Sequence, residues 1–424
     1  MKWVSAHRAR LKDFVIACGA VRISEHRCSA SRDLRSCSGP RPTGQGLRAP
    51  VPARRRWRPV SPVPMRRRSF GGVPPMPTCS AGAIRPSVAR VLPDRVSGWR
   101  IRQMRVWSAA MTPQRPSPAV AVLLATYNGA PTLAEQLDSY LAQTRLPDLV
   151  LISDDGSTDG TRDAVEAFRV AHPEIRIEVV DGPRRGPAQN FFSLLQRTPA
   201  WIDVVALSDQ DDVWLPDKLE RGLRALTEAA MPGVPTLYCA RTLECDETLQ
   251  RRRLSRGMSR PPGFRHALVQ NIAGGNTMML DRAGLDLVRE GSVEARRVVV
   301  HDWWIYQIVT GAGGRVVFDQ KPVLLYRQHS GNLIGANTGL AAKARRLRLM
   351  LSGRFRRWNT INIRALSASA HRLTPENRQL LLEFEACRQG PVWKRLRTMR
   401  QTRLYRQGFQ GLLSLYAAAL LGRL

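Results

Sequence analysis

Residues 204–214 read VVALSDQDDVW: four apolar residues and a serine, followed by three carboxylates within four positions. An apolar run of this kind is typical of a buried strand, so the carboxylates fall where the strand would end. Two like charges about 4 Å apart repel by roughly 4 kcal/mol at an effective dielectric of about 20. A fold therefore keeps Asp209, Asp211 and Asp212 together only if a positive group offsets them, and a divalent cation is the usual one.

The surrounding residues 119–327 alternate between strand-like and helix-like patterns. This alternation predicts an α/β fold with a doubly wound, mostly parallel sheet. Such sheets bind ligands beyond the carboxyl ends of their strands. The expected strands are 119–124, 149–152, 175–180 and 204–207, and the expected helices are 131–141, 161–170 and 215–226.

Polar residues follow three of the expected strands, at 126–128, 154–155 and 209–211. Because these strand ends meet at one edge of a parallel sheet, their convergence predicts a ligand site. A glycine-rich dinucleotide motif does not follow the first strand, and the sequence contains no P-loop motif. A metal ion is therefore the expected partner of a bound diphosphate. Tyr127 could stack on a uracil or thymine ring whose N–H donates to a carboxylate.

The net charge of +32 is distributed unevenly along the chain. Residues 1–110 hold 23 Lys/Arg against 4 Asp/Glu, residues 111–340 hold 25 against 27, and residues 341–424 hold 18 against 3. We therefore expect three parts. Residues 1–117 are a basic segment, either disordered or the product of a start assigned upstream of Met111. Residues 118–340 are the α/β domain, and residues 341–424 are a helical basic extension.

The basic extension interleaves Lys and Arg with Leu and aromatic residues, chiefly at 343–358 and 393–409. This composition suits an anionic membrane surface, where each nearby cation contributes about 1 kcal/mol. Solvated helix faces are the simpler alternative. Nucleic-acid binding is another, but no base-reading motif is recognised, and we expect no nucleic-acid partner. No segment has the roughly 18 apolar residues of a membrane span. We expect a cytoplasmic protein, peripheral at the inner face of the cytoplasmic membrane.

Five motifs, taken in order, resemble those of the family 2 inverting glycosyltransferases of the GT-A fold. They are ATYNG at 125–129, DDGSTDGT at 154–161, DQDDVW at 209–214, HDWW at 301–304 and YRQHSGNLIG at 326–335. The last two look like the rhamnosyltransferase-type branch. The resemblance implies a Rossmann-like, doubly wound mixed sheet. It also implies transfer of a sugar, with dTDP-rhamnose favoured over a UDP-sugar as donor, to a saccharide or lipid-linked saccharide in cell-surface polysaccharide or O-antigen synthesis.

The resemblance also assigns the residues that hold the nucleotide. Tyr127 and Asp155 match positions that hold the base, and Asp154 lies beside them. Thr126 and Asn128 complete the first motif. An enzymatically inactive domain of the same fold, in a protein that binds membranes or nucleic acid, is the alternative of a different class.

The diphosphate and metal residues come from the later motifs. Asp211 is expected to bind Mg²⁺ or Mn²⁺, with Asp209 as a second ligand that also lies near the ribose. His329 is a candidate third ligand. The alternative is that His329 is an ordinary surface or core histidine. Arg327 is expected to pair with phosphate oxygens, against the alternative of a solvated charge.

Asp302 is the candidate catalytic base, because its motif matches the place where the family keeps that group. It would accept a proton from the acceptor hydroxyl that attacks the anomeric carbon. The alternative for Asp302 is a helix N-cap. For two neighbours of the acidic motif we favour structural roles: a helix N-cap for Asp212 and core packing for Trp214.

Overall fold

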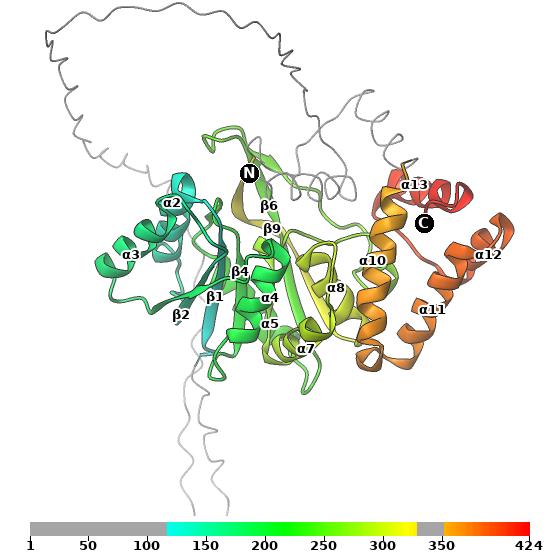
Figure 1. Cartoon of the computed structure of the whole chain (residues 1–424), viewed down its shortest axis with the longest axis horizontal. Coiled ribbons are helices and arrows are strands. Elements are labelled where there is room, and N and C mark those ends of the chain that lie inside the picture. Colours follow the sequence, from blue (N-terminus) through cyan, green and yellow to red (C-terminus); the bar gives the residue numbers. More distant parts are fainter. Residues whose placement is uncertain (1–116, 329–351) are drawn as a thin grey trace, which may run out of the picture. The chain divides into compact units, whose positions relative to one another are not determined.

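The structure is a computed structural model that describes residues 117–328 and 352–424 (Figure 1). The predicted basic segment 1–117, apart from its last residue, and the candidate ligand His329 lie outside the described residues.

One half of the central sheet is parallel. It consists of β1 (Val120–Thr126), β2 (Leu149–Asp154), β3 (Ile177–Asp181) and β4 (Val204–Ser208), arranged in the order β3-β2-β1-β4. The apolar runs that predicted these strands are buried in β1, β2 and β4. The predicted α/β architecture is therefore confirmed, and all four strands end at the same edge.

The other half of the sheet is mixed. β8 (Met279–Leu280) lies antiparallel between β4 and β6 (Thr236–Cys245), and β9 (Arg315–Arg327) pairs with β6 in parallel. β5 (Val213–Trp214) pairs antiparallel with β9, and β7 (Arg253–Leu254) pairs with β6. The sheet is thus mixed, as the resemblance implied, rather than mostly parallel.

Helices cover both faces of the sheet because alternate residues of β1 point to opposite sides. Ala121 and Leu123 share a hydrophobic core with α4, α7 and α8, whereas Val120, Val122 and Leu124 share another with α2, α3 and α5. Their bounds are α2 (Ala130–Leu141), α3 (Thr161–Ala171), α4 (Pro187–Arg197), α5 (Lys218–Ala229), α7 (Arg282–Glu294) and α8 (His301–Gly311), with the short α6 (Phe264–Ala267) between β7 and β8.

Two of the three predicted helices match α2 and α3, and the third differs at its start. The helix expected from Leu215 begins only at Lys218, because Val213 and Trp214 pair with β9 as a strand. Helix α4 was not predicted. Its buried face includes Phe191 and Phe192, which pack in the hydrophobic core on one side of the sheet.

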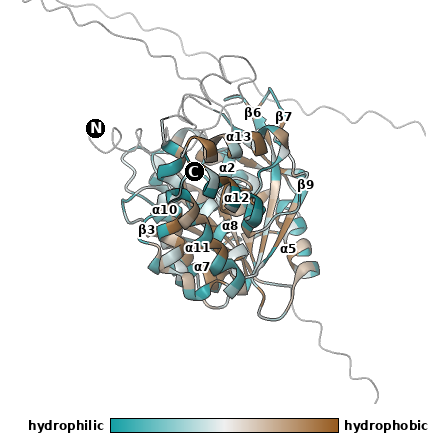
Figure 2. Cartoon of the chain, turned by 90° about the vertical axis from the view of Figure 1, so that its right-hand side faces the viewer, coloured by the Kyte–Doolittle hydropathy of each residue, from teal (hydrophilic) through white to brown (hydrophobic). Residues whose placement is uncertain are grey.

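The described part of the basic extension is helical, as predicted. It forms α10 (Arg354–Ala368), α11 (Pro375–Gln389), α12 (Val392–Thr402) and α13 (Gly408–Leu420), with hydrophobic residues along α13 and hydrophilic ones along α12 (Figure 2). Phe355 and Trp358 of α10 join the hydrophobic cluster that contains Trp303, and the two indoles meet edge to face. Within residues 117–328 and 352–424, none of the helices has the length and apolar content needed to cross a membrane.

Candidate active site

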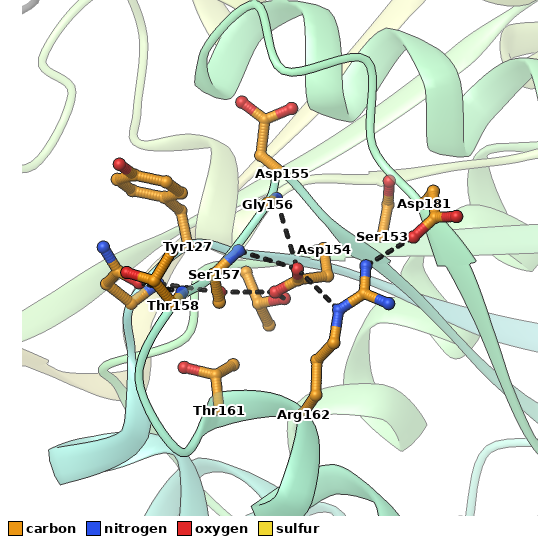
Figure 3. A network of polar contacts seen from close by, with 12 residues as sticks. Tyr127, Ser153, Asp154, Asp155, Gly156, Ser157, Thr158, Thr161, Arg162 and Asp181 are labelled. Atoms are coloured by element: carbon orange, nitrogen blue, oxygen red, sulfur yellow. Dashed lines mark hydrogen bonds and ion pairs between the residues drawn. The ribbon is translucent and has the colours of Figure 1, made fainter. Parts of the chain in front are cut away.

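Asp154, the last residue of β2, is buried and hydrogen-bonded from several sides (Figure 3). Its carboxylate accepts from Thr126 Oγ1 at 3.0 Å, from the Ser157 backbone N–H at 2.9 Å and from Arg162 Nε at 3.0 Å. Burial alone would raise the pKa of Asp154, but hydrogen bonds from Ser157, Arg162 and Thr126 lower it below its ordinary value. Asp154 is therefore an ionised residue whose oxygens shape the loop after β2.

Asp155 points away from its neighbour and organises a different loop (Figure 3). Its two oxygens accept the backbone N–H groups of Arg184 at 2.6 Å and Gly186 at 2.9 Å. Both of these residues have positive φ, at 55° and 90°, a conformation that their loop needs in order to turn both N–H groups inward. The carboxylate thus joins the loop after β2 to the loop after β3.

The ends of β1, β2 and β4 are also linked to one another. The Tyr127 backbone N–H donates to Gln210 Oε1 at 2.8 Å, and Gln210 Nε2 donates to the Tyr127 carbonyl at 3.1 Å. Asn128 adopts positive φ and accepts the Thr158 N–H at 2.8 Å. The structure therefore brings together the three predicted strand ends. Gln210 was not among the predicted site residues, although its place between two motif carboxylates was a signal.

The acidic residues after β4 contrast with Asp154. Asp209 and Asp211 are partly buried, while Asp212 is fully buried. Burial raises the pKa of Asp209 to about 7, and repulsion from Asp211 and Asp302 adds to the effect. Asp302 comes from the start of α8, so the structure brings the predicted catalytic base within electrostatic reach of the acidic motif.

Lys218 is a buried lysine beside this cluster that sequence reasoning missed. Its Nζ donates to the Asn276 carbonyl at 2.6 Å and lies 3.1 Å from the centroid of the Trp214 ring. Asn276 Nδ2 in turn donates to Asp212 at 2.6 Å. Burial raises the pKa of Asp212 and lowers that of Lys218, and their mutual attraction opposes both shifts. The sequence signal was a lysine beside Leu219 at the start of an apolar helix face.

Two structural predictions about this motif have different outcomes. The expected N-cap role of Asp212 is wrong, because the residue precedes strand β5 and helix α5 begins six residues later. Its carboxylate instead binds the loop at Asn276. The expected packing role of Trp214 is confirmed, since its ring is buried and meets Tyr140 edge to face.

Asp302 lies in the first turn of α8. Burial raises its pKa to about 7, although hydrogen bonds from the Trp303 backbone, the Asn271 side chain and the Gly275 backbone lower it in part. The helix cap is Val300, so the alternative that Asp302 is the N-cap is wrong. Trp303 is fully buried and donates its indole N–H to the Ala267 carbonyl at 2.7 Å, which is a packing role.

His301, next to the candidate base, is buried and uncharged. Burial lowers its pKa to about 3, and its ring stacks on Phe191 with the centroids 3.9 Å apart. Among the residues that the structure describes, its Nε2 has no hydrogen-bond partner. It faces Gly275, where a Cβ would lie only 2.3 Å from that nitrogen, so a glycine is required there.

Arg327 ends β9 and is buried rather than solvated, so that alternative is wrong. Its Nε donates to the Asp211 carbonyl at 3.1 Å, and its other nitrogens contact the Glu247 carbonyl and the carboxylate of Glu135. The guanidinium therefore holds the backbone of the acidic motif in place. A contact to phosphate stays a prediction.

The acidic motif fits a divalent cation in charge and in donor type. Mg²⁺ and Mn²⁺ prefer carboxylate oxygens, and Mg²⁺ in particular is commonly held by one or two carboxylates together with phosphate oxygens and waters. Burial raises the pKa of Asp209, and repulsion from Asp211 and Asp302 adds to it, so a cation beside these carboxylates would offset part of their charge. Within 117–328 and 352–424, no group of three or more His, Cys, Asp or Glu is placed to hold a metal. A cation here would therefore be held by Asp209 and Asp211 together with further ligands, such as phosphate oxygens of the donor and water.

Comparison with known proteins identifies a domain within the chain. Residues 121–280 match the model described as glycosyl transferase family 2. The chain carries a family 2 glycosyltransferase domain. This stretch of the glycosyltransferase contains the first three predicted motifs and all of the parallel strands. The predicted family is thereby confirmed, together with its GT-A arrangement of a mixed sheet between helices.

The glycosyltransferase is similar to proteins of known or assigned role. It is 28% identical over 241 residues to dTDP-rhamnosyl transferase RfbG of Shigella flexneri, covering 55% of this chain and 81% of that protein. It is 28% identical over 182 residues to the putative teichuronic acid biosynthesis glycosyltransferase TuaG of Bacillus subtilis, covering 42% and 69%. Among solved structures, mannosyltransferase PcManGT of Pyrobaculum calidifontis, in complex with GDP-Man and Mn²⁺, aligns with 20% identity and a TM-score of 0.39 over 73% and 86% of the two chains.

Proposed function

We propose that this glycosyltransferase is an inverting enzyme that moves a sugar, with rhamnose favoured, from a nucleotide-diphosphate donor to a saccharide acceptor. The observation that supports the proposal is that Asp302, from the start of α8, lies within electrostatic reach of Asp209, which follows β4. A base can take the proton of the attacking hydroxyl, and a bound metal can stabilise the leaving diphosphate, which are two contributions that favour direct displacement at an anomeric carbon.

Asp302 suits general-base catalysis because its pKa of about 7 lies near the operating pH. The hydroxyl oxygen of the acceptor attacks the anomeric carbon from the face opposite the diphosphate. As the new carbon–oxygen bond forms, the hydroxyl proton moves to the Asp302 carboxylate and the bond to the diphosphate oxygen breaks. The configuration at the anomeric carbon inverts, through a transition state that resembles an oxocarbenium ion.

The leaving diphosphate needs its negative charge offset. Asp211 and Asp209 would hold Mg²⁺ or Mn²⁺, which when bound stabilises the charge that develops on a leaving phosphate oxygen. Arg327 fixes the Asp211 backbone through a 3.1 Å hydrogen bond. Gln210 keeps this motif against Tyr127, whose ring we assign to the nucleotide base.

The donor and acceptor are inferred from the relatives. The similarity to a dTDP-rhamnosyl transferase supports dTDP-rhamnose, with a UDP-hexose as the second candidate. The similarity to proteins named for teichuronic acid and succinoglycan biosynthesis supports a saccharide or lipid-linked saccharide of the cell envelope as acceptor. A cytoplasmic enzyme bound to the inner face of the membrane would meet such an acceptor.

A nucleotide-release assay tests this proposal. Full-length protein is incubated with dTDP-rhamnose, UDP-glucose, UDP-GlcNAc and GDP-mannose, each with Mn²⁺, with Mg²⁺ or with EDTA. We expect release to be fastest with dTDP-rhamnose and to disappear with EDTA. If nucleotide is released only from a UDP-hexose, then the donor is a UDP-hexose and not dTDP-rhamnose. Nucleotide binding without release from any donor would favour an enzymatically inactive domain. Equal release rates with and without EDTA would contradict the proposed metal requirement.

A binding experiment isolates the role of Asp211. Titration calorimetry with dTDP should show that Mn²⁺ tightens binding to the wild type, but not to Asp211→Asn. Asp217→Asn is the matched control, because Asp217 lies partly exposed at the start of α5, where its carboxylate pairs with Arg221. An equal effect of Mn²⁺ on all three proteins would contradict the assignment.

A further inference from the structure

Helix α13 presents an apolar stripe to solvent. Phe409, Leu413 and Leu420 are 80%, 60% and 50% exposed, and their spacing of four and seven residues places them on one face of the helix. The opposite face, with Leu415 and Ala418, is buried in the hydrophobic core. Single exposed leucines are common, but a phenylalanine and two leucines aligned on one face indicate an interaction surface.

The neighbouring helix α12 carries positive charge and an exposed indole. Lys394, Arg397 and Arg400 are exposed, and Trp393 is 66% exposed. The spacing of four and seven residues places Trp393 on the same face of the helix as Arg397 and Arg400. Residues 390–424 contain seven Lys and Arg and no Asp or Glu. The exposed apolar residues therefore lie in a segment of one sign of charge, with no acidic side chain of its own.

The two helices form one unit because Arg395 joins them. Its guanidinium donates to the carbonyls of Ala419 at 2.6 Å and Leu420 at 3.2 Å, and also to the Gly390 carbonyl at 2.7 Å. These bonds satisfy the free carbonyls at the C-terminal end of α13 and hold it against the start of α12. The hydrophobic α13 and the hydrophilic α12 are visible in Figure 2.

We propose that α12 and α13 form a docking surface for an anionic phospholipid bilayer, into which Phe409, Leu413 and Leu420 insert while Trp393 lies at the headgroup level. Exposed apolar side chains with cations on the neighbouring helix complement acyl chains beneath anionic headgroups, and tryptophan is enriched at that boundary. A polynucleotide would match the cations but offers nothing to the aliphatic stripe. The docking surface is independent of the proposed reaction, although a lipid-linked acceptor would explain its presence.

Vesicle flotation with the full chain tests the docking surface. Vesicles of phosphatidylcholine alone are compared with vesicles containing 30% phosphatidylglycerol, at low and at high salt. We expect binding only to the anionic vesicles, and an affinity at least about tenfold lower for Phe409→Ser/Leu413→Ser, because two inserted side chains are lost. The matched control is Val170→Ser/Val293→Ser, which changes two residues that are each 70% exposed on α3 and α7 and should bind like the wild type.

The high-salt arm matters because residues 1–110 also carry many cations. Salt screens such electrostatic attraction, whereas insertion of apolar side chains persists. A second measurement therefore follows Trp393 with lipids brominated along the acyl chain, which quench nearby indoles. Quenching of the wild type should exceed that of Trp393→Phe. Circular dichroism of every variant, with a thermal melt, establishes that the chain remains folded.

Several outcomes would overturn the proposal. These are wild-type binding by Phe409→Ser/Leu413→Ser, equal binding to neutral vesicles, or no difference in quenching between wild type and Trp393→Phe. A smaller oligomer for the double variant without vesicles would identify the stripe as an interface between copies of the chain. Binding to a short RNA that anionic vesicles do not displace would identify a nucleic-acid surface. A protein that docks but releases no nucleotide would refute the proposed reaction alone.

Discussion

The carboxylates at the end of β2 and those after β4 lie at the same edge of the sheet, but their pKa values are shifted in opposite directions. Asp154 has its oxygens hydrogen-bonded by neighbours that lower its pKa. Asp209 and Asp302 are held where burial raises the pKa of each to about 7. Asp154 and Asp155 accept hydrogen bonds that hold the loops after β2 and β3. Asp209 and Asp302 are the candidates for binding a cation and accepting a proton. Position at a strand end is therefore not enough to make a carboxylate reactive.

Removing the proposed base should have the largest effect of the changes considered, and the effect should be on kcat. We expect Asp302→Asn to lower kcat by about 10³-fold, since general-base catalysis contributes roughly 10² to 10⁴, and to leave donor binding unchanged. In the wild type, kcat/KM should rise with pH below about 7 and level off above it, because only the ionised carboxylate accepts a proton.

The matched control for Asp302→Asn is Asp138→Asn, at an exposed position of α2. It should retain wild-type kcat. Turnover by Asp302→Asn within threefold of the wild type would show that another group takes the proton.

Lys218 tests how the acidic group is held. Lys218→Met removes the hydrogen bond to the Asn276 carbonyl and the electrostatic attraction between Lys218 and the buried Asp212. We expect the free energy of unfolding in urea to fall by about 3 kcal/mol. The double variant with Asp212→Asn should recover much of this loss, because the buried charge is gone. Two independent losses that simply add would contradict the coupling.

Asp154 should matter for stability more than for chemistry. Asp154→Ala leaves Thr126 Oγ1, the Ser157 N–H and Arg162 Nε without their acceptor. We expect a loss of about 2 kcal/mol in the free energy of unfolding, with kcat per folded molecule close to that of the wild type. A selective loss of kcat in a protein of unchanged stability would make Asp154 a member of the reactive group.

The pH dependence of stability should separate the two regions most finely. A carboxyl group whose pKa is raised on folding, such as Asp209, loses its stabilising contribution as pH rises from about 4 to 7. The lowered pKa of Asp154 acts in the opposite sense, so its contribution is lost as pH falls below about 4. In thermal melts with EDTA, Asp209→Asn should therefore gain about 3 °C over the wild type at pH 8 and little at pH 5. An equal difference at both pH values would contradict the raised pKa.

Local pattern predicted the elements well where neighbouring residues alone determined their burial. The apolar runs of β1, β2 and β4 and the leucine spacing of α2 are properties of neighbouring residues, and burial follows from them directly. Strand β5 was missed because two residues carry too little periodicity to be seen, and its pairing partner β9 lies more than 100 residues away. That one pairing also explains why α5 begins late and why Asp212 is not a cap.

What the sequence by itself determined is the family, the α/β order and the identity of the carboxylates that follow the strands, because these depend on residue type and short-range spacing. Only the tertiary structure decided which carboxylates are satisfied. Asp154 meets Arg162, Asp212 meets Asn276, and Asp302 comes from a different helix to within reach of Asp209. Charge state depends on burial and on partners far away in the chain, and both exist only once the sheet and its helices have assembled.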